Sequence, residues 1–167
     1  MVSDRVAIDT CVLVNIMTGG KVDEAHWLEA STAVVRAAER GEYRLTVSAL
    51  VIAELAGTGE IRGKHIPSKV RKARIGKVRA FMAEAGYLIV ETDARTAGKA
   101  ADLAINHQLF GPDAIILASA LHSNSKILYT WDKDLLKLNG EFPLQILKPS
   151  DIPTGVQLDL FFSGSGA

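Results

Sequence analysis

The chain has 167 residues, 19 basic and 19 acidic side chains, and 48% hydrophobic residues. This length suits one domain with a real core, and no apolar run approaches the roughly 20 residues that cross a bilayer. The single cysteine, Cys11, excludes an internal disulfide, and the N-terminus lacks the pattern of a signal peptide. We therefore expect a cytoplasmic protein without a membrane segment.

Short apolar strands alternate with helices along the chain. We expect strands at 6–9, 43–47, 88–91, 126–129 and 144–147. We expect helices at 10–17, 23–40, 49–56, 68–85, from Thr92 or Asp93 to about 106, and from Asp113 to 121. This alternation predicts a three-layer α/β/α sandwich with a mostly parallel central sheet over residues 1–152, followed by a C-terminal tail at 153–167.

Acidic residues stand where apolar strands end or inside apolar helices. Asp9 ends the first strand, Asp113 opens an otherwise apolar helix, and Asp132 and Asp134 follow the fourth strand. Glu54 lies within another apolar helix. Buried carboxylates are costly unless something neutralises them, and the carboxyl ends of parallel strands meet at one edge of a sheet. We therefore expect a shared pocket for a hard divalent cation.

The same acids also have structural interpretations. Asp9 and Asp113 stand where helices begin and could act as N-caps, and Asp134 could cap residues 135–138. Glu54 is the hardest to explain in this way, because a lone glutamate on an apolar helix face is costly. For Asp134 the cap and the metal ligand are left open.

Three other polar or aromatic residues have competing interpretations. Ser48 is expected to cap the helix that follows it rather than to take part in catalysis. Cys11 is expected to be a small core residue, because no histidine lies in a convincing pairing motif for a nucleophile. Trp131 could stack on a base, but packing beside the pocket is the simpler expectation.

A basic helical segment is predicted at about 57–85. Residues 62–79 hold eight Lys or Arg residues and no acid. Such a patch beside an acidic pocket suggests a polyanionic substrate. A solvated face, an acidic protein partner or a dimer mate are alternatives. The candidate phosphate contacts are Lys69, Arg71, Lys72 and Arg74.

The tail contains a short apolar pattern. It resembles the peptide by which partners bind the bacterial sliding clamp, which could fill a preformed apolar groove. The alternative is that the tail folds back on this domain or on a dimer mate. The residues of this possible clamp motif are Gln157, Leu158, Asp159, Leu160 and Phe161.

Over about residues 5–148 the chain resembles the PIN-domain ribonucleases. The motifs that carry the resemblance occur in the order and the elements of that family. They are Asp9-Thr10 with Asn15, Ser48 to Leu55 with Glu54, the helix that opens at Asp113, and Thr130-Trp131-Asp132-Lys133-Asp134. In size the chain resembles the VapC-like toxins of type II toxin–antitoxin pairs.

The resemblance implies a metal-dependent endoribonuclease that hydrolyses phosphodiesters to a 5′-phosphate and a 3′-hydroxyl. It implies Mg²⁺ or Mn²⁺ held by the catalytic residues Asp9, Glu54, Asp113 and Asp132, with Asp134 as a further metal ligand. Thr10, Asn15, Ser48 and Thr130 would orient the ligands or the water. It also implies a homodimer, an RNA substrate and an antitoxin partner.

Two alternatives belong to other functional classes. One is a PIN nuclease outside toxin–antitoxin systems, acting in RNA processing or on DNA, which clamp binding by the tail would favour. The other is a non-enzymatic signalling module of the receiver type, because receivers also place acids at strand ends. The acids, threonine and lysine of this chain do not follow the receiver order.

Overall fold

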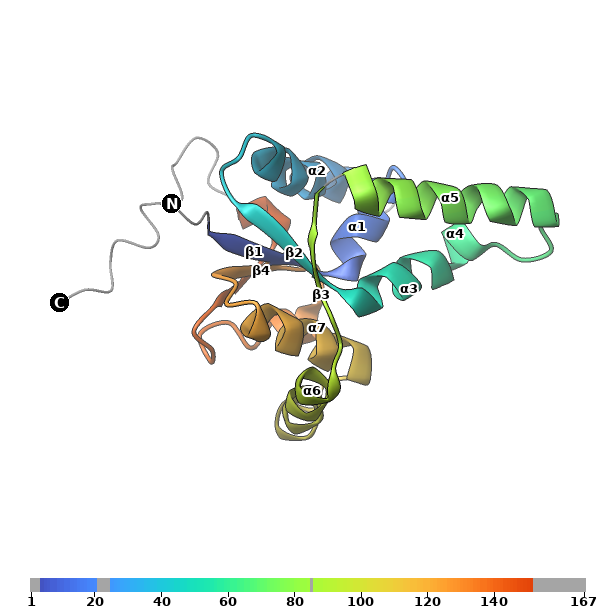
Figure 1. The fold of residues 1–167 in the computed structure, drawn as a ribbon. Coiled ribbons are helices and arrows are strands. Elements are labelled where there is room, and N and C mark those ends of the chain that lie inside the picture. The colour runs from blue at the N-terminus through green and yellow to red at the C-terminus, as the bar shows by residue number, and fades with distance from the viewer. Residues whose placement is uncertain (1–3, 21–24, 85, 152–167) are drawn as a thin grey trace.

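The computed structural model describes residues 4–20, 25–84 and 86–151, and within them five strands form one sheet. The strand order is β3-β2-β1-β4-β5, and every neighbouring pair is parallel. The strands are β1 (Arg5–Ile8), β2 (Arg44–Ser48), β3 (Leu88–Val90), β4 (Ile127–Tyr129) and β5 (Gln145–Leu147). Helices cover both faces of the sheet (Figure 1), which confirms the predicted α/β/α sandwich.

The helices follow the predicted order with one short addition. They are α1 (Thr10–Met17), α2 (Ala25–Glu39), α3 (Ala49–Gly57), α4 (Gly59–Arg62), α5 (Ser68–Glu84), α6 (Ala94–His107), α7 (Gly111–His122) and α8 (Lys133–Leu136), before a 3₁₀ turn at Pro149–Asp151. The sequence did not predict α4, because four residues are too few to show a helical period. The short helix considered at 135–138, with Asp134 as its cap, instead lies at 133–136 as α8. Helix α7 begins at Gly111, earlier than expected, because Pro112 is favourable in a first helical turn.

The core is built from buried residues of the central strands and of helices α1, α2, α3, α5 and α7. Strand β4 is buried along its whole length between β1 and β5. Helix α7 buries all residues from Ile116 to Ala120, as its almost wholly apolar sequence predicts. Because α7 is packed in the core over most of its length, its first turn has a fixed position relative to the sheet. Asp113 lies in that turn. Among the described residues, no helix is long and apolar enough to cross a membrane.

Helices α3, α4 and α5 project from the sheet as an arm (Figure 1). Towards its end, α5 packs on the body through Val78 and Met82, which are buried. Nearer its start, Val70 and Ile75 are 41% and 45% exposed. The Arg74 side chain joins α5 to α4, since its Nη1 atom donates hydrogen bonds to two carbonyl oxygens of α4 at 3.2 and 3.0 Å. We call α4 and α5 together the basic arm.

Candidate active site

Asp9 lies at the carboxyl end of β1 and is only 4% exposed. It occupies the N-cap position of α1, but its side chain makes no capping hydrogen bond, so the capping interpretation is wrong for this residue. Its Oδ2 atom instead accepts hydrogen bonds from Thr130 Oγ1 at 2.5 Å and from Cys11 Sγ at 3.1 Å. Burial raises the pKa of Asp9, although these hydrogen bonds oppose the rise. The chain thus holds a buried acid in place without using it as a cap.

Thr130 connects the acid after β1 to the acid after β4. Its Oγ1 atom donates to Asp9 and accepts a hydrogen bond from the backbone N–H of Asp132 at 2.8 Å. Oδ1 of Asp132 then caps α8 by accepting from the backbone N–H groups of Asp134 and Leu135, at 2.8 and 3.0 Å. Because each link is a hydrogen bond, the two carboxylates keep a fixed relation across neighbouring strands.

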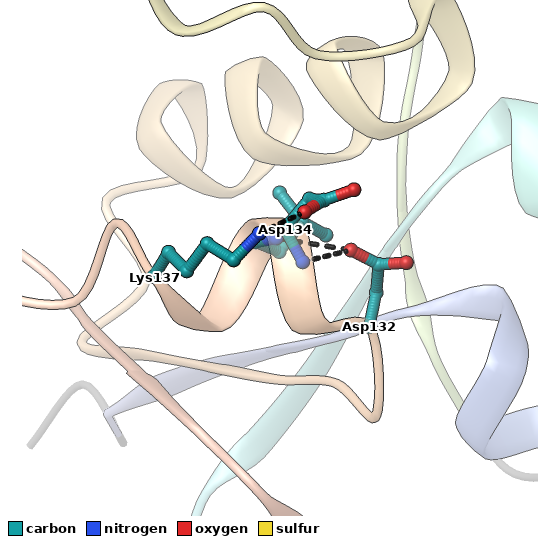
Figure 2. A network of polar contacts seen from close by, with 4 residues as sticks. Asp132, Asp134 and Lys137 are labelled. Carbon is teal, nitrogen blue, oxygen red and sulfur yellow. Dashed lines mark hydrogen bonds and ion pairs between the residues drawn. The ribbon is translucent and has the colours of Figure 1, made fainter.

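Asp134 has a different environment from Asp132. It is exposed, and its Oδ1 atom forms an ion pair with Lys137 Nζ at 2.6 Å (Figure 2). Because Asp132 caps α8, the interpretation of Asp134 as the cap is wrong. Of the two acids, Asp132 is the one joined to Asp9 through Thr130.

Glu54 reaches the same region from the side of α3. It is partly buried, and its Oε2 atom accepts a hydrogen bond from Thr10 Oγ1 at 2.5 Å. The start of α3 is fixed by Ser48, whose Oγ accepts from the backbone N–H of Leu50 at 3.3 Å, which confirms Ser48 as a cap. The cap and the threonine together orient Glu54 towards the start of α1.

Asp113 lies in the first turn of α7 and is half-buried. Phe110 holds the N-cap position of this helix, so Asp113 is not its cap. The pKa of Asp113 rises to about 6, first through burial and then through the negative charges of Asp132, Asp9, Glu54 and Asp134, in that order. A charge raises a neighbour's pKa only over short distances. Asp113 therefore lies within electrostatic range of the acids from the other three predicted motifs.

The chain matches the family model of the PIN domain over residues 6–141. It belongs to the PIN-domain family. Members of this family are nucleases that generally use divalent metal ions. The match covers all five acids of the candidate active site and ends within the predicted domain at 1–152, whose exact limits stay a prediction.

Three solved structures share the fold of this PIN domain. A toxin–antitoxin complex from Klebsiella pneumoniae matches with 19% identity and a TM-score of 0.58, over 86% of this chain and 97% of that one. VapC20 of Mycobacterium tuberculosis, a toxin that cleaves the sarcin–ricin loop, matches with 15% identity and a TM-score of 0.60, over 84% and 98%. FitAcB of Neisseria gonorrhoeae matches with 17% identity and a TM-score of 0.57, over 88% and 99%. Among curated proteins, no sequence matches the chain.

The donor atoms of the PIN domain's acidic cluster are carboxylate oxygens, which suit hard cations such as Mg²⁺ and Mn²⁺. Among the described residues, no three His, Cys, Asp or Glu side chains lie close enough together to form a metal-binding group. The charges of the other acids raise the pKa of Asp113, and that of Asp132 adds to the raised pKa of Asp9.

Cys11 and Asn15 are held within helix α1, next to Asp9. The thiol pKa of Cys11 is raised well above its usual value, first by burial and then by the charge of Asp9. The thiol is therefore a protonated donor to Asp9, in agreement with the expectation that it is not a nucleophile. Asn15 is 2% exposed.

Trp27 is a residue beside the cluster that the sequence did not single out. Its ring stacks on that of Trp131, with centroids 4.7 Å apart and planes at 9°. Nε1 of Trp131 donates to Ser31 Oγ at 2.9 Å, so Trp131 packs beside the acids as expected. No motif marks Trp27, because only the fold brings α2 against the loop after β4.

The predicted nucleic-acid contacts lie on the basic arm, away from the central strands (Figure 1). Lys69, Arg71 and Lys72 are exposed, whereas Arg74 is less exposed and binds the carbonyls of α4. The predicted clamp motif at 157–161 lies outside the described residues, and its role stays a prediction.

Proposed function

We propose that this PIN domain is a metal-dependent endoribonuclease and the toxin of a toxin–antitoxin pair. The observation that carries the proposal is the set of hydrogen bonds that joins Asp9 to Asp132 through Thr130 and ties Glu54 to Thr10 beside Asp9, with Asp113 near enough for their charges to raise its pKa. Four acids that repel one another are costly unless a cation neutralises them.

In the proposed site, Asp9, Glu54, Asp113 and Asp132 hold Mg²⁺ or Mn²⁺, with Asp134 at the margin. A bound ion would neutralise charge on the phosphodiester and lower the pKa of an attacking water. The hydrogen bonds of the chain would orient the ligand carboxylates for binding of the ion. Hydrogen bonds from partners behind the ligands reduce their freedom, and such partners commonly affect metal affinity. These partners are Thr130 and Cys11 for Asp9, Thr10 for Glu54, and the start of α8 for Asp132.

In this proposal the basic arm binds the phosphate backbone of the RNA. Lys69, Arg71 and Lys72 project into solvent from a helix that carries no acid from its start to Arg79. Basic side chains bind the phosphate backbone without regard to sequence, and the binding weakens as salt rises. The arm therefore positions a strand, while contacts nearer the acids decide where it is cut. We expect products with a 5′-phosphate and a 3′-hydroxyl.

The toxin role rests on similarity to the toxin–antitoxin proteins from Klebsiella, Mycobacterium and Neisseria, each matched over nearly its whole length. A toxin requires a neutralising antitoxin, and we expect one encoded beside this chain. We also expect a homodimer.

The proposal is tested by incubating purified protein with a mixed RNA pool and a single-stranded DNA pool, in Mg²⁺, in Mn²⁺ and in EDTA. Asp113→Asn is the test variant, and Asp102→Asn, an exposed acid on α6, is the matched control. RNA cleavage that needs metal, persists in Asp102→Asn and is lost in Asp113→Asn supports the nuclease. Cleavage of DNA alone would refute the RNA assignment, and equal cleavage by the two variants would refute the site. The toxin role requires that induction of the unmodified chain, but not of Asp9→Asn, arrests bacterial growth.

A further inference from the structure

A hollow of about 520 Å³ opens next to Glu54, between helices α1, α2 and the end of α3. Its walls are Thr10, Cys11, Val14, Trp27, Glu54, Gly57 and Thr58. We propose that this hollow receives one nucleobase of the substrate strand, next to the phosphate that is cut, and that Trp27 is the residue that contacts this base. The inference rests on the proposed nuclease function, which it extends from the reaction to the recognition of a single base.

The lining of the hollow favours a base over a phosphate. None of its described lining residues is Lys or Arg, and Glu54 brings negative charge to one wall. The lining offers a phosphate no basic side chain, whereas an uncharged base would meet Val14 and Trp27 on the apolar side. The volume lies within the roughly 300–1,000 Å³ of typical small-ligand sites. Bases bind aromatic side chains in sites that take single strands.

Trp27 is rigid and fixed relative to the acids. It stacks on Trp131, whose backbone N–H donates to Cys11 Sγ at 3.3 Å, and Cys11 in turn donates to Asp9. A chain of contacts therefore joins the indole of Trp27 to the acid at the centre of the cluster. Because the stack on Trp131 already holds the Trp27 ring in place, binding of a base there costs little side-chain entropy. A base held against Trp27 would fix the register of the strand at the acids.

The test uses RNA octamers that carry a single 2-aminopurine, a fluorescent base whose emission is quenched when it stacks. Binding is measured in Mg²⁺ with Asp113→Asn as the background, so that the octamers stay intact. Quenching is expected at one position of the strand. Trp27→Leu should abolish it and weaken binding about tenfold to a hundredfold, the range expected for one lost base stack. Trp27→Phe keeps an aromatic ring and should retain most of both effects. Ile105→Ala, at a residue 80% exposed on α6, is the control and should change neither.

A second comparison separates base contact from a general loss of structure. The second RNA is an octamer with an abasic residue at the quenched position. The protein with Trp27 should bind this abasic octamer more weakly than the complete octamer. Trp27→Leu should bind the two octamers with equal affinity. Equal affinity of Trp27→Leu and its parent for the complete octamer, or an equal abasic penalty in both, would overturn the proposal and leave the hollow to a protein segment. These outcomes can occur while the unmodified chain still cuts RNA. Failure of the nuclease function itself would appear separately, as absence of metal-dependent cleavage.

Discussion

Replacing Asp113 by asparagine should stabilise the metal-free protein at neutral pH while removing its activity. The side chain lies in the first turn of α7, where burial and then the negative charges of Asp132, Asp9 and Glu54 raise its pKa. Ionisation of Asp113 therefore costs free energy in the folded chain that it does not cost in the unfolded chain. Asparagine has nearly the same shape and removes this cost.

The magnitude follows from the pKa of Asp113, which rises from 3.8 to about 6 on folding. At about 1.36 kcal/mol for each pH unit this corresponds to about 3 kcal/mol. Solvent screening of a half-buried group reduces the expected gain to about 1–2 kcal/mol. An acid with a raised pKa binds more protons when folded than when unfolded, so its contribution to stability falls as pH rises from about 4 to 6 and stays low above that.

The assay is urea unfolding in EDTA at several pH values between 4 and 8. Asp113→Asn should be more stable than the parent at pH 7 and should match it at pH 4, with a shallower decline between them. Asp9 keeps part of the decline in both proteins, because burial raises its pKa as well. Addition of Mg²⁺ should stabilise the parent more than the variant. Parallel pH profiles for the two proteins would show that Asp113 is not repelled by its neighbours, and the argument for a converging cluster would fail.

Three further variants test other parts of the structure. Asp9→Asn should reduce RNA cleavage at least a hundredfold with an unchanged circular dichroism spectrum, and retained cleavage would exclude Asp9 from the site. Gly63→Ala should lower the free energy of unfolding by about 1–2 kcal/mol, because Gly63 has a φ of +63° and an added Cβ would lie 2.7 Å from Arg74 Nη1. Gly59→Ala, which meets nothing within 4 Å, should cost far less, and equal urea midpoints for the two would contradict this account. Reversal of charge at Lys72 should reduce the slope of the logarithm of the RNA-binding constant against the logarithm of the salt concentration by about one phosphate contact. An unchanged slope would show that the basic arm is a solvated face.

The sequence was sufficient to predict the fold because its signals are local and repeated. Apolar strands alternate with amphipathic or apolar helices, and only a parallel sheet covered on both faces buries all of them. Boundaries were less well predicted. Strand β3 ends at Val90 rather than at residue 91, and α7 starts at Gly111, because hydrogen bonding and Pro112 rather than hydrophobicity decide where these elements end and begin.

Details of the candidate site depend on contacts between residues distant in sequence. Which of Asp132 and Asp134 lies nearer to Asp9 follows from the hydrogen bonds of Thr130 and α8, and residue spacing does not reveal it. Trp27 is more than a hundred residues from Trp131 in sequence, so no local pattern could link them. The hydrogen bond from the Cys11 thiol to Asp9 could not be predicted from the spacing of the residues.

The strongest physical argument for a catalytic role comes from Asp9. It stands at a position where an aspartate could stabilise a helix by capping it, by about 1 kcal/mol. Its carboxylate makes no capping hydrogen bond and instead accepts hydrogen bonds from the side chains of Cys11 and Thr130 in a buried position, where burial raises its pKa. The fold thus forgoes a favourable interaction and keeps a costly charge next to Asp132 and Asp113. Such an arrangement is expected where the missing stabilisation comes from a bound cation, which is the role proposed for these acids.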